Sequence, residues 1–70
     1  MEELKLKVEE FIREKYGIDE IEYESKEYFN YVYILDVLYR YCIYNHKHSV
    51  EIMPIADKLI READKLLELK

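Results

Sequence analysis

The side chains that could do chemistry gather between positions 36 and 48, where Asp36, Arg40, Cys42, His46 and His48 fall within one short segment. Two histidines at i and i+2 of a strand point the same way, so this pair could bind a divalent metal. One cysteine and two histidines, however, are fewer than the four ligands of a structural zinc site, and their spacing matches no zinc finger. We predict that the chain holds no metal and no cofactor.

Cys42 has a histidine four residues further on, an arrangement that could activate a thiolate. Its immediate neighbours are Tyr41 and Ile43, however, and apolar neighbours favour a buried, unreactive thiol. A glycine-rich phosphate loop is absent, because Gly17 is the only glycine in the sequence. We therefore predict that the protein is not an enzyme.

Arg40 and His46 are spaced in a way that resembles the R-x(4–6)-H motif of HEPN ribonucleases. The resemblance implies an all-helical fold in which the arginine and the histidine act on the 2′-hydroxyl and the phosphate of RNA at a dimer interface. It covers two residues only. The polar residue expected after the arginine is Tyr41 here, so this function is a minor alternative.

Seventy residues predict a single domain, 1–70, with a small core. Such domains usually need a disulfide, a metal or oligomerisation for stability. A disulfide within the chain is excluded because Cys42 is the only cysteine, so we expect a homo-oligomer, most simply a dimer. Many charged residues and few amides are typical of thermophiles, which favours a thermophilic archaeon or its virus as the source.

The net charge of −5 is concentrated in residues 1–27, which contain ten acidic and five basic side chains. Proteins that bind the nucleic-acid backbone generally show a basic patch instead. Residues 1–10 lack the features of a signal peptide, and the apolar stretch 28–44 carries Asp36 and Arg40 near its middle, where a membrane would penalise them. We expect a cytoplasmic protein with no membrane partner.

Two amphipathic helices are predicted, one near each end of the chain. Residues 2–16 place apolar side chains at i, i+4, i+7 and i+8, and Gly17 follows where a left-handed residue ends a helix. Residues 54–69 begin with a proline, which suits the first turn of a helix, and carry a similar apolar stripe.

Residues 28–44, YFNYVYILDVLYRYCIY, hold six of the eight tyrosines. As a strand, their odd positions are all apolar or aromatic, and most of their residues belong to types that favour strands. We therefore predict strands at 20–25, 28–45 and 49–53. The expected fold is α+β, with the order α-β-β-β-α and a small antiparallel sheet whose two helices cover one face, burying odd positions such as Phe29 and Ile43.

The alternative for residues 28–44 is a helix, which would make the protein all-α, a three-helix antiparallel bundle. Ser25 would then be the N-cap, Asp36 and Arg40 would form an i,i+4 ion pair, and Asn45 would stand at the C-terminus of the helix. Because β-branched and aromatic residues lose rotamer freedom in helices, we favour the strand.

The sheet face that the helices leave uncovered is the predicted functional surface. An exposed apolar face of that size usually marks an interface, and Tyr and Arg are favoured at interface hot spots. We predict that this face forms a homodimer or binds a protein partner. Its residues are Val32, Ile34, Asp36, Leu38, Arg40, Cys42 and Tyr44.

Exposed tyrosines on a sheet could instead stack nucleic-acid bases. The predicted element order resembles a double-stranded-RNA-binding domain, although the basic cluster of that family at the start of its last helix is missing here. Candidate nucleic-acid contacts are Arg40, His46, Lys47 and His48. The leading prediction is a small non-enzymatic interaction or regulatory module, and nucleic-acid binding is the alternative.

Overall fold

The computed structural model describes residues 2–69, and the side chains of residues 3–69. Its elements are α1 (Glu2–Tyr16), α2 (Lys26–Tyr44), the 3-10 helix η1 (Ser49–Ile55) and α3 (Ala56–Glu68). No residue in the described range belongs to a strand. The predicted α-β-β-β-α fold is therefore wrong, and the protein is a bundle-like arrangement of three α-helices.

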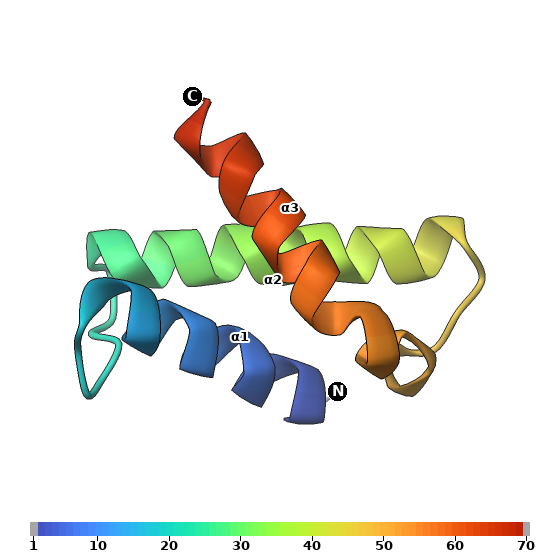
Figure 1. Ribbon diagram of the computed structural model, residues 1–70, viewed down its shortest axis with the longest axis horizontal. Coiled ribbons are helices and arrows are strands. Elements are labelled where there is room, and N and C mark those ends of the chain that lie inside the picture. The colour runs from blue at the N-terminus through green and yellow to red at the C-terminus, as the bar shows by residue number, and fades with distance from the viewer. Residues whose placement is uncertain (1, 70) are drawn as a thin grey trace.

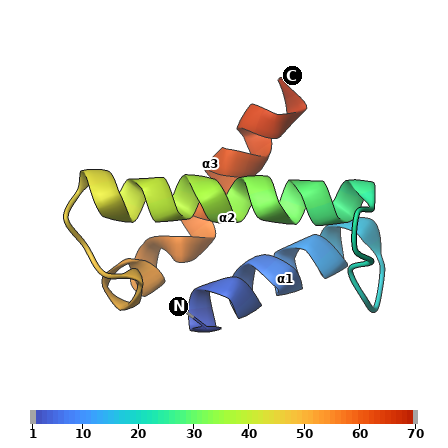
Figure 2. The same cartoon turned by 180° about the vertical axis from the view of Figure 1, so that it is seen from behind.

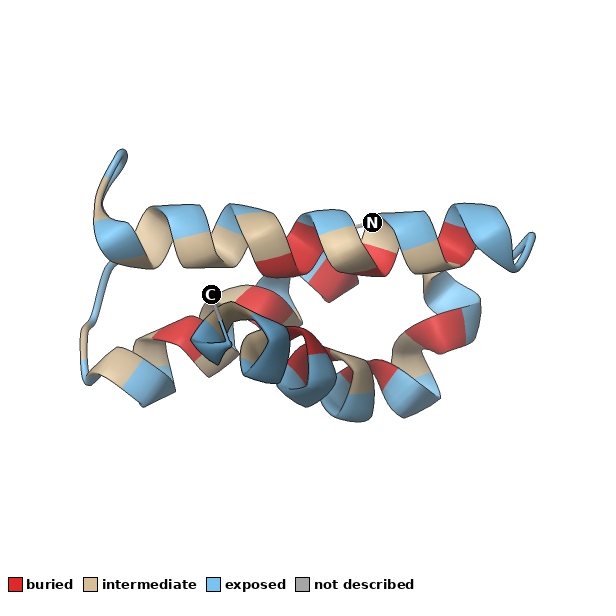
Figure 3. Cartoon of the chain, turned by 90° about the horizontal axis from the view of Figure 1, so that it is seen from above, coloured by how far each residue is buried: buried red, intermediate tan, exposed pale blue. Residues whose placement is uncertain are grey.

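Helix α2 forms one layer by itself, and α1, η1 and α3 form the layer that packs against it (Figures 1 and 3). In Figure 1, α1 runs beside α2, whereas α3 crosses it. The ribbon positions coloured as buried lie mostly where the two layers face each other (Figure 3). They are Leu4, Val8 and Ile12 of α1, Ile34, Leu35, Leu38 and Cys42 of α2, Ile52 of η1, and Ala56, Ile60 and Ala63 of α3.

The first predicted helix is confirmed at both ends. Its apolar stripe is buried in the core, as the helical spacing indicates. Gly17 follows with a φ of 63°, and the N–H of Ile18 donates to the carbonyl oxygen of Arg13 at 3.1 Å. This 6→1 bond with a left-handed glycine is a Schellman motif, which satisfies a terminal carbonyl of α1.

The last predicted helix is confirmed except for its first turn. Pro54 lies inside η1, and the α-helical geometry begins at Ala56. The predicted strand 49–53 is wrong because those residues form η1. The N–H of His48 donates to Oε2 of Glu51 at 2.7 Å, which supplies a partner at the start of this turn.

Residues 28–44 are helical, and local hydrogen bonds cap both ends of α2. Ser25 is the N-cap, and its Oγ accepts the N–H of Tyr28 at 3.1 Å. At the other end His46 has a φ of 53°, and the N–H of Lys47 donates to the carbonyl oxygen of Cys42 at 2.9 Å. This is a second Schellman motif, in which a histidine takes the position that glycine usually occupies.

Core packing gives the physical reason for the helix. Ile34, Leu38 and Cys42 stand at i, i+4 and i+8, and all three are buried against the other layer. Burial of such side chains is worth more than the tenths of a kcal/mol per residue that aromatic and β-branched types lose in a helix. The predicted strand 20–25 is wrong too: it is a turn segment in which Glu24 has a φ of 64°.

Polar contacts also join elements that are distant in the sequence. Nζ of Lys15 in α1 lies 2.5 Å from Oδ1 of Asp64 in α3, and this hydrogen bond raises the pKa of Lys15. The side-chain amide of Asn30 in α2 donates to the hydroxyl of Tyr16 in α1. Both contacts help to position α1 between its two neighbours.

Replacing Leu38 by alanine tests the helical placement of this segment. Because Leu38 is fully buried, we expect Leu38→Ala to lower the free energy of unfolding by about 2–5 kcal/mol, measured by urea denaturation followed by circular dichroism. Leu66→Ala is the matched control, because Leu66 is half exposed on α3, and its expected loss is about 1 kcal/mol or less. Equal losses in the two variants would contradict the core position of Leu38.

Candidate interaction surface on helix α2

The side of α2 that faces away from α1 and α3 has no other element over it within the described chain (Figure 2). We call this side the outer face. At 100° per residue its members lie within about 120° of arc. They are Phe29, Val32, Asp36, Arg40, Ile43 and Tyr44.

Four of the six outer-face residues are large apolar or aromatic side chains that lie in solvent. Phe29 is 60 % exposed, Val32 42 %, Ile43 69 % and Tyr44 74 %. A surface helix of a soluble protein normally turns a polar face to water. An exposed face that carries this many apolar side chains is characteristic of a contact surface.

Asp36 and Arg40 form an ion pair at the middle of the outer face. Nε of Arg40 donates to Oδ2 of Asp36 at 2.9 Å, the i,i+4 pair that the helical alternative predicted. Both side chains are exposed, and exposed ion pairs contribute little to folding stability. The pair therefore places one charge of each sign on an otherwise apolar surface, where both are available to another molecule.

The predicted interface residues fall on two different sides of α2. Val32, Asp36, Arg40 and Tyr44 lie on the outer face. Three others lie on the core side and are buried, because a helical period of 3.6 separates residues that a strand would align. These three are Ile34, Leu38 and Cys42.

Phe29 and Ile43 are outer-face residues that sequence analysis placed in the core. The signal that could have identified them is a spacing of seven, since Phe29, Asp36 and Ile43 recur at the interval of a heptad. This interval was hard to recognise because nearly every position of the segment is apolar or aromatic, so an alternating pattern fits the same residues.

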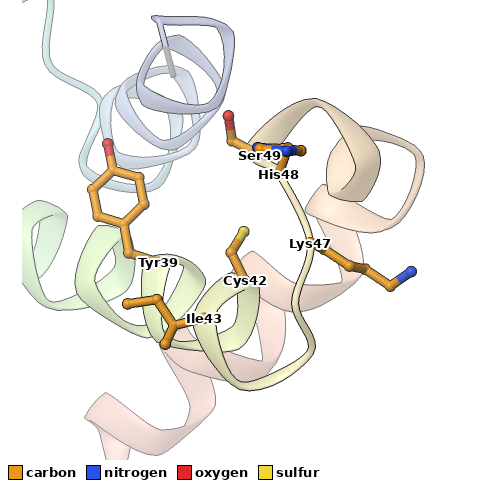
Figure 4. A pocket seen from close by; sticks show the side chains of 6 residues that line it. All are labelled: Tyr39, Cys42, Ile43, Lys47, His48 and Ser49. Carbon is orange, nitrogen blue, oxygen red and sulfur yellow. The ribbon is translucent and has the colours of Figure 1, made fainter.

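A groove of about 480 Å³ opens beside the C-terminal end of α2 (Figure 4). The ring of Tyr39 stands on one side and His48 and Ser49 on the other, while the thiol of Cys42 points in between them (Figure 4). The ammonium group of Lys47 points away (Figure 4). A second groove of about 340 Å³ on the outer face shares two of its residues, Tyr39 and Ile43. The two grooves are therefore adjacent.

The larger groove contains one thiol and one hydroxyl that are both buried. Cys42 is buried, and this burial raises the pKa of its thiol, so a smaller fraction is thiolate at neutral pH. The hydroxyl of Tyr39 is buried and has no hydrogen-bond partner in the described part of the chain. Among the described residues, no group of three His, Cys, Asp or Glu side chains could hold a metal ion.

An aromatic cluster lies at the opposite, N-terminal end of α2. It consists of Tyr23, Tyr28 and Phe29, with ring centroids 4.9 Å apart for the first two and 5.9 Å for the last two. Tyr23 and Phe29 are mostly exposed. The preceding segment, 19–24, is acidic, so this end of the helix presents aromatic rings next to negative charge.

The candidate nucleic-acid contacts are not gathered into one patch. Arg40 is paired with Asp36 on the outer face, whereas His46, Lys47 and His48 follow α2 in a turn. The sheet that was to present stacked tyrosines does not exist among the described residues. His46 has a structural role, since it ends α2 in a left-handed conformation.

The burial of Cys42 predicts slow modification. We expect a disulfide reagent such as Ellman's to react with the native protein at pH 8 at least about tenfold more slowly than with the chain unfolded in urea, because burial limits access and the raised pKa lowers the thiolate fraction. The rates are followed by absorbance, with a small free thiol under both conditions as control. Equal rates would contradict the buried position.

None of the helices described between residues 2 and 69 is long and apolar enough to cross a membrane. No protein family model, curated protein or solved structure matches this chain.

Proposed function

We propose that the protein is a small non-enzymatic module that acts by protein–protein contact through the outer face of α2, with a second copy of the chain as its partner. The observation that carries this proposal is the exposure of Phe29, Val32, Ile43 and Tyr44 on one uncovered helix face. Such a surface is costly in water and is typical of proteins that bury it against another molecule.

The energy available from this face is large for a domain of this size. Because Phe29 is 60 % exposed and Ile43 69 %, covering either side chain contributes roughly 1–2 kcal/mol. Small domains have few residues with which to build a core, and oligomerisation commonly supplies the missing burial. Association through α2 would add a second apolar layer to the helix that already anchors the fold.

The charges on the outer face favour a copy of the same chain over an arbitrary partner. Asp36 and Arg40 give the face one negative and one positive group close together. A surface that carries both signs can complement itself when two copies meet in opposite directions. A face made for a strongly acidic or a strongly basic partner would carry one sign only.

Light scattering tests the proposal. We expect the protein at micromolar concentration to have the mass of a dimer and Ile43→Glu to have the mass of a monomer, because the substitution places a charge in the contact. Leu6→Glu is the matched control, since Leu6 is exposed on α1, and the same charge change there should leave the dimer intact. A monomeric mass for the unaltered chain would sink the proposal.

The helical fold also favours a second candidate function, an HEPN-like ribonuclease. That resemblance implied helices throughout, and Arg40 and His46 are both exposed, one on the last turns of α2 and the other directly after it. Against it stands the ion pair of Arg40 with Asp36, which puts a negative carboxylate where the phosphate of RNA would have to approach.

Ribonuclease activity is measured with a fluorescent single-stranded RNA substrate. If this candidate is right, the chain cleaves RNA, and Arg40→Ala and His46→Ala each lower the rate by at least about a hundredfold, the usual size of a general acid–base or charge-stabilising contribution. Lys47→Ala is the control for unspecific loss of positive charge. Absence of cleavage by the unaltered chain excludes the candidate and leaves the interaction module untouched.

A further inference from the structure

We propose that the second copy binds antiparallel to the first along α2, with the aromatic cluster of each copy seated on the groove of the other. This inference rests on the proposed self-association and specifies its geometry. The elements that carry it are the central ion pair, the cluster at the N-terminal end of α2 and the groove at its C-terminal end.

The central pair fixes the register of the two helices. When two copies of α2 run in opposite directions with Leu38 at the midpoint, Asp36 of each copy faces Arg40 of the other. Each Asp36 carboxylate can then contact two arginines, its own Arg40 and that of the second copy. The centre of the dimer then holds four charges of alternating sign. A shift by one helical turn would bring like charges together, and like-charge contacts are costly.

The same register matches the ends of the outer face. Val32 and Tyr44 are symmetric about Leu38, so Val32 of each copy lies at the level of Tyr44 of the other. One apolar and one aromatic side chain therefore stand at the same level on each side of the charges. The smaller groove is lined by residues at i, i+3, i+4 and i+7, the set that receives a side chain in knobs-into-holes packing. They are Asp36, Tyr39, Arg40 and Ile43.

The aromatic cluster and the larger groove lie on the same side of the outer face. At 100° per residue, Tyr28 and Val32 at one end fall within about 60° of arc of Tyr39 and Ile43 at the other. A twofold axis that relates antiparallel, face-to-face helices keeps each flank of one helix beside the same flank of its copy. The rings of Tyr28 and Phe29 are thereby brought to the apolar groove of the second copy.

Charge selects the antiparallel orientation over the parallel one. The segment before α2 is acidic, with Glu22 and Glu24 beside the cluster, and positive charge follows at Arg40 and Lys47. Antiparallel pairing places each acidic end against a basic end. Parallel pairing would align like charges along the whole helix and would also align the two helix dipoles unfavourably.

Cross-linking distinguishes the two orientations. The variants are Val32→Cys and Tyr44→Cys, each in a Cys42→Ala background so that the native thiol does not react, and the reagent is a bismaleimide of about 10 Å reach, which matches the spacing of packed helices. In the antiparallel dimer, residue 32 lies at the level of residue 44 of the second copy. Residue 32 of the second copy lies about 18 Å further along the helix axis.

We expect a covalent dimer when the two cysteine variants are mixed in equal amounts, and at least about tenfold less when either is treated alone. The Cys42→Ala background without further change is the control for unspecific reaction. Cross-linking within each variant alone would overturn the antiparallel geometry while leaving self-association intact. A monomeric mass of the unaltered chain, measured before cross-linking, would instead mean that the proposed function itself has failed.

A charge exchange tests the central pair independently. We expect Asp36→Arg and Arg40→Asp each to raise the dissociation constant of the dimer at least about tenfold, since like charges would meet at the centre. An equal mixture of these two variants should recover the dimer, and so should the chain that carries both changes. Circular dichroism confirms that each variant is helical. Dimers that withstand both single changes would overturn the proposed exchange of partners between Asp36 and Arg40.

Discussion

Helix α2 is apolar on two opposite sides, and this constraint governs the rest of the structure. Ile34, Leu38 and Cys42 point to one side and are covered by α1, η1 and α3. Phe29 and Ile43 point to the other side and remain in solvent. Two short helices and a 3-10 turn cover one side of this nineteen-residue helix, and the described residues supply no further element for the second side.

The covered side determines how the short helices are arranged. α1 and α3 each present a single apolar stripe, so each can bury it only by packing on α2 or on the other. Polar contacts at the edges of the core complete the arrangement, through the hydrogen bond of Lys15 with Asp64 and that of Asn30 with Tyr16. These contacts fix positions, while burial supplies most of the stability.

The sequence allowed reliable prediction where the apolar pattern had one period only. Residues 2–16 have a helical stripe and a glycine after it, and the helix ends where predicted. In residues 28–44 nearly every position is apolar or aromatic, so alternation along a strand and a stripe along a helix fit equally well. The deciding information was outside this segment, in the N-cap at Ser25 and in the stripes of α1 and α3, which supply a cover for one side of a helix. Because of the same ambiguity, the prediction placed Leu38 at the surface and Phe29 in the core, the reverse of what the structure shows.

The two sides of α2 differ in whether they carry charged residues. The core side contains no buried charge among the described residues, whereas the exposed side carries Asp36 and Arg40 at its centre. Purely apolar helix faces can slide past one another by a turn at little cost, which gives several registers of similar energy. In the proposed dimer, a central pair of opposite charges would remove that degeneracy, because only one antiparallel register satisfies both groups. It would do so at some expense of affinity, since charges buried in an interface lose hydration that their partners only partly replace.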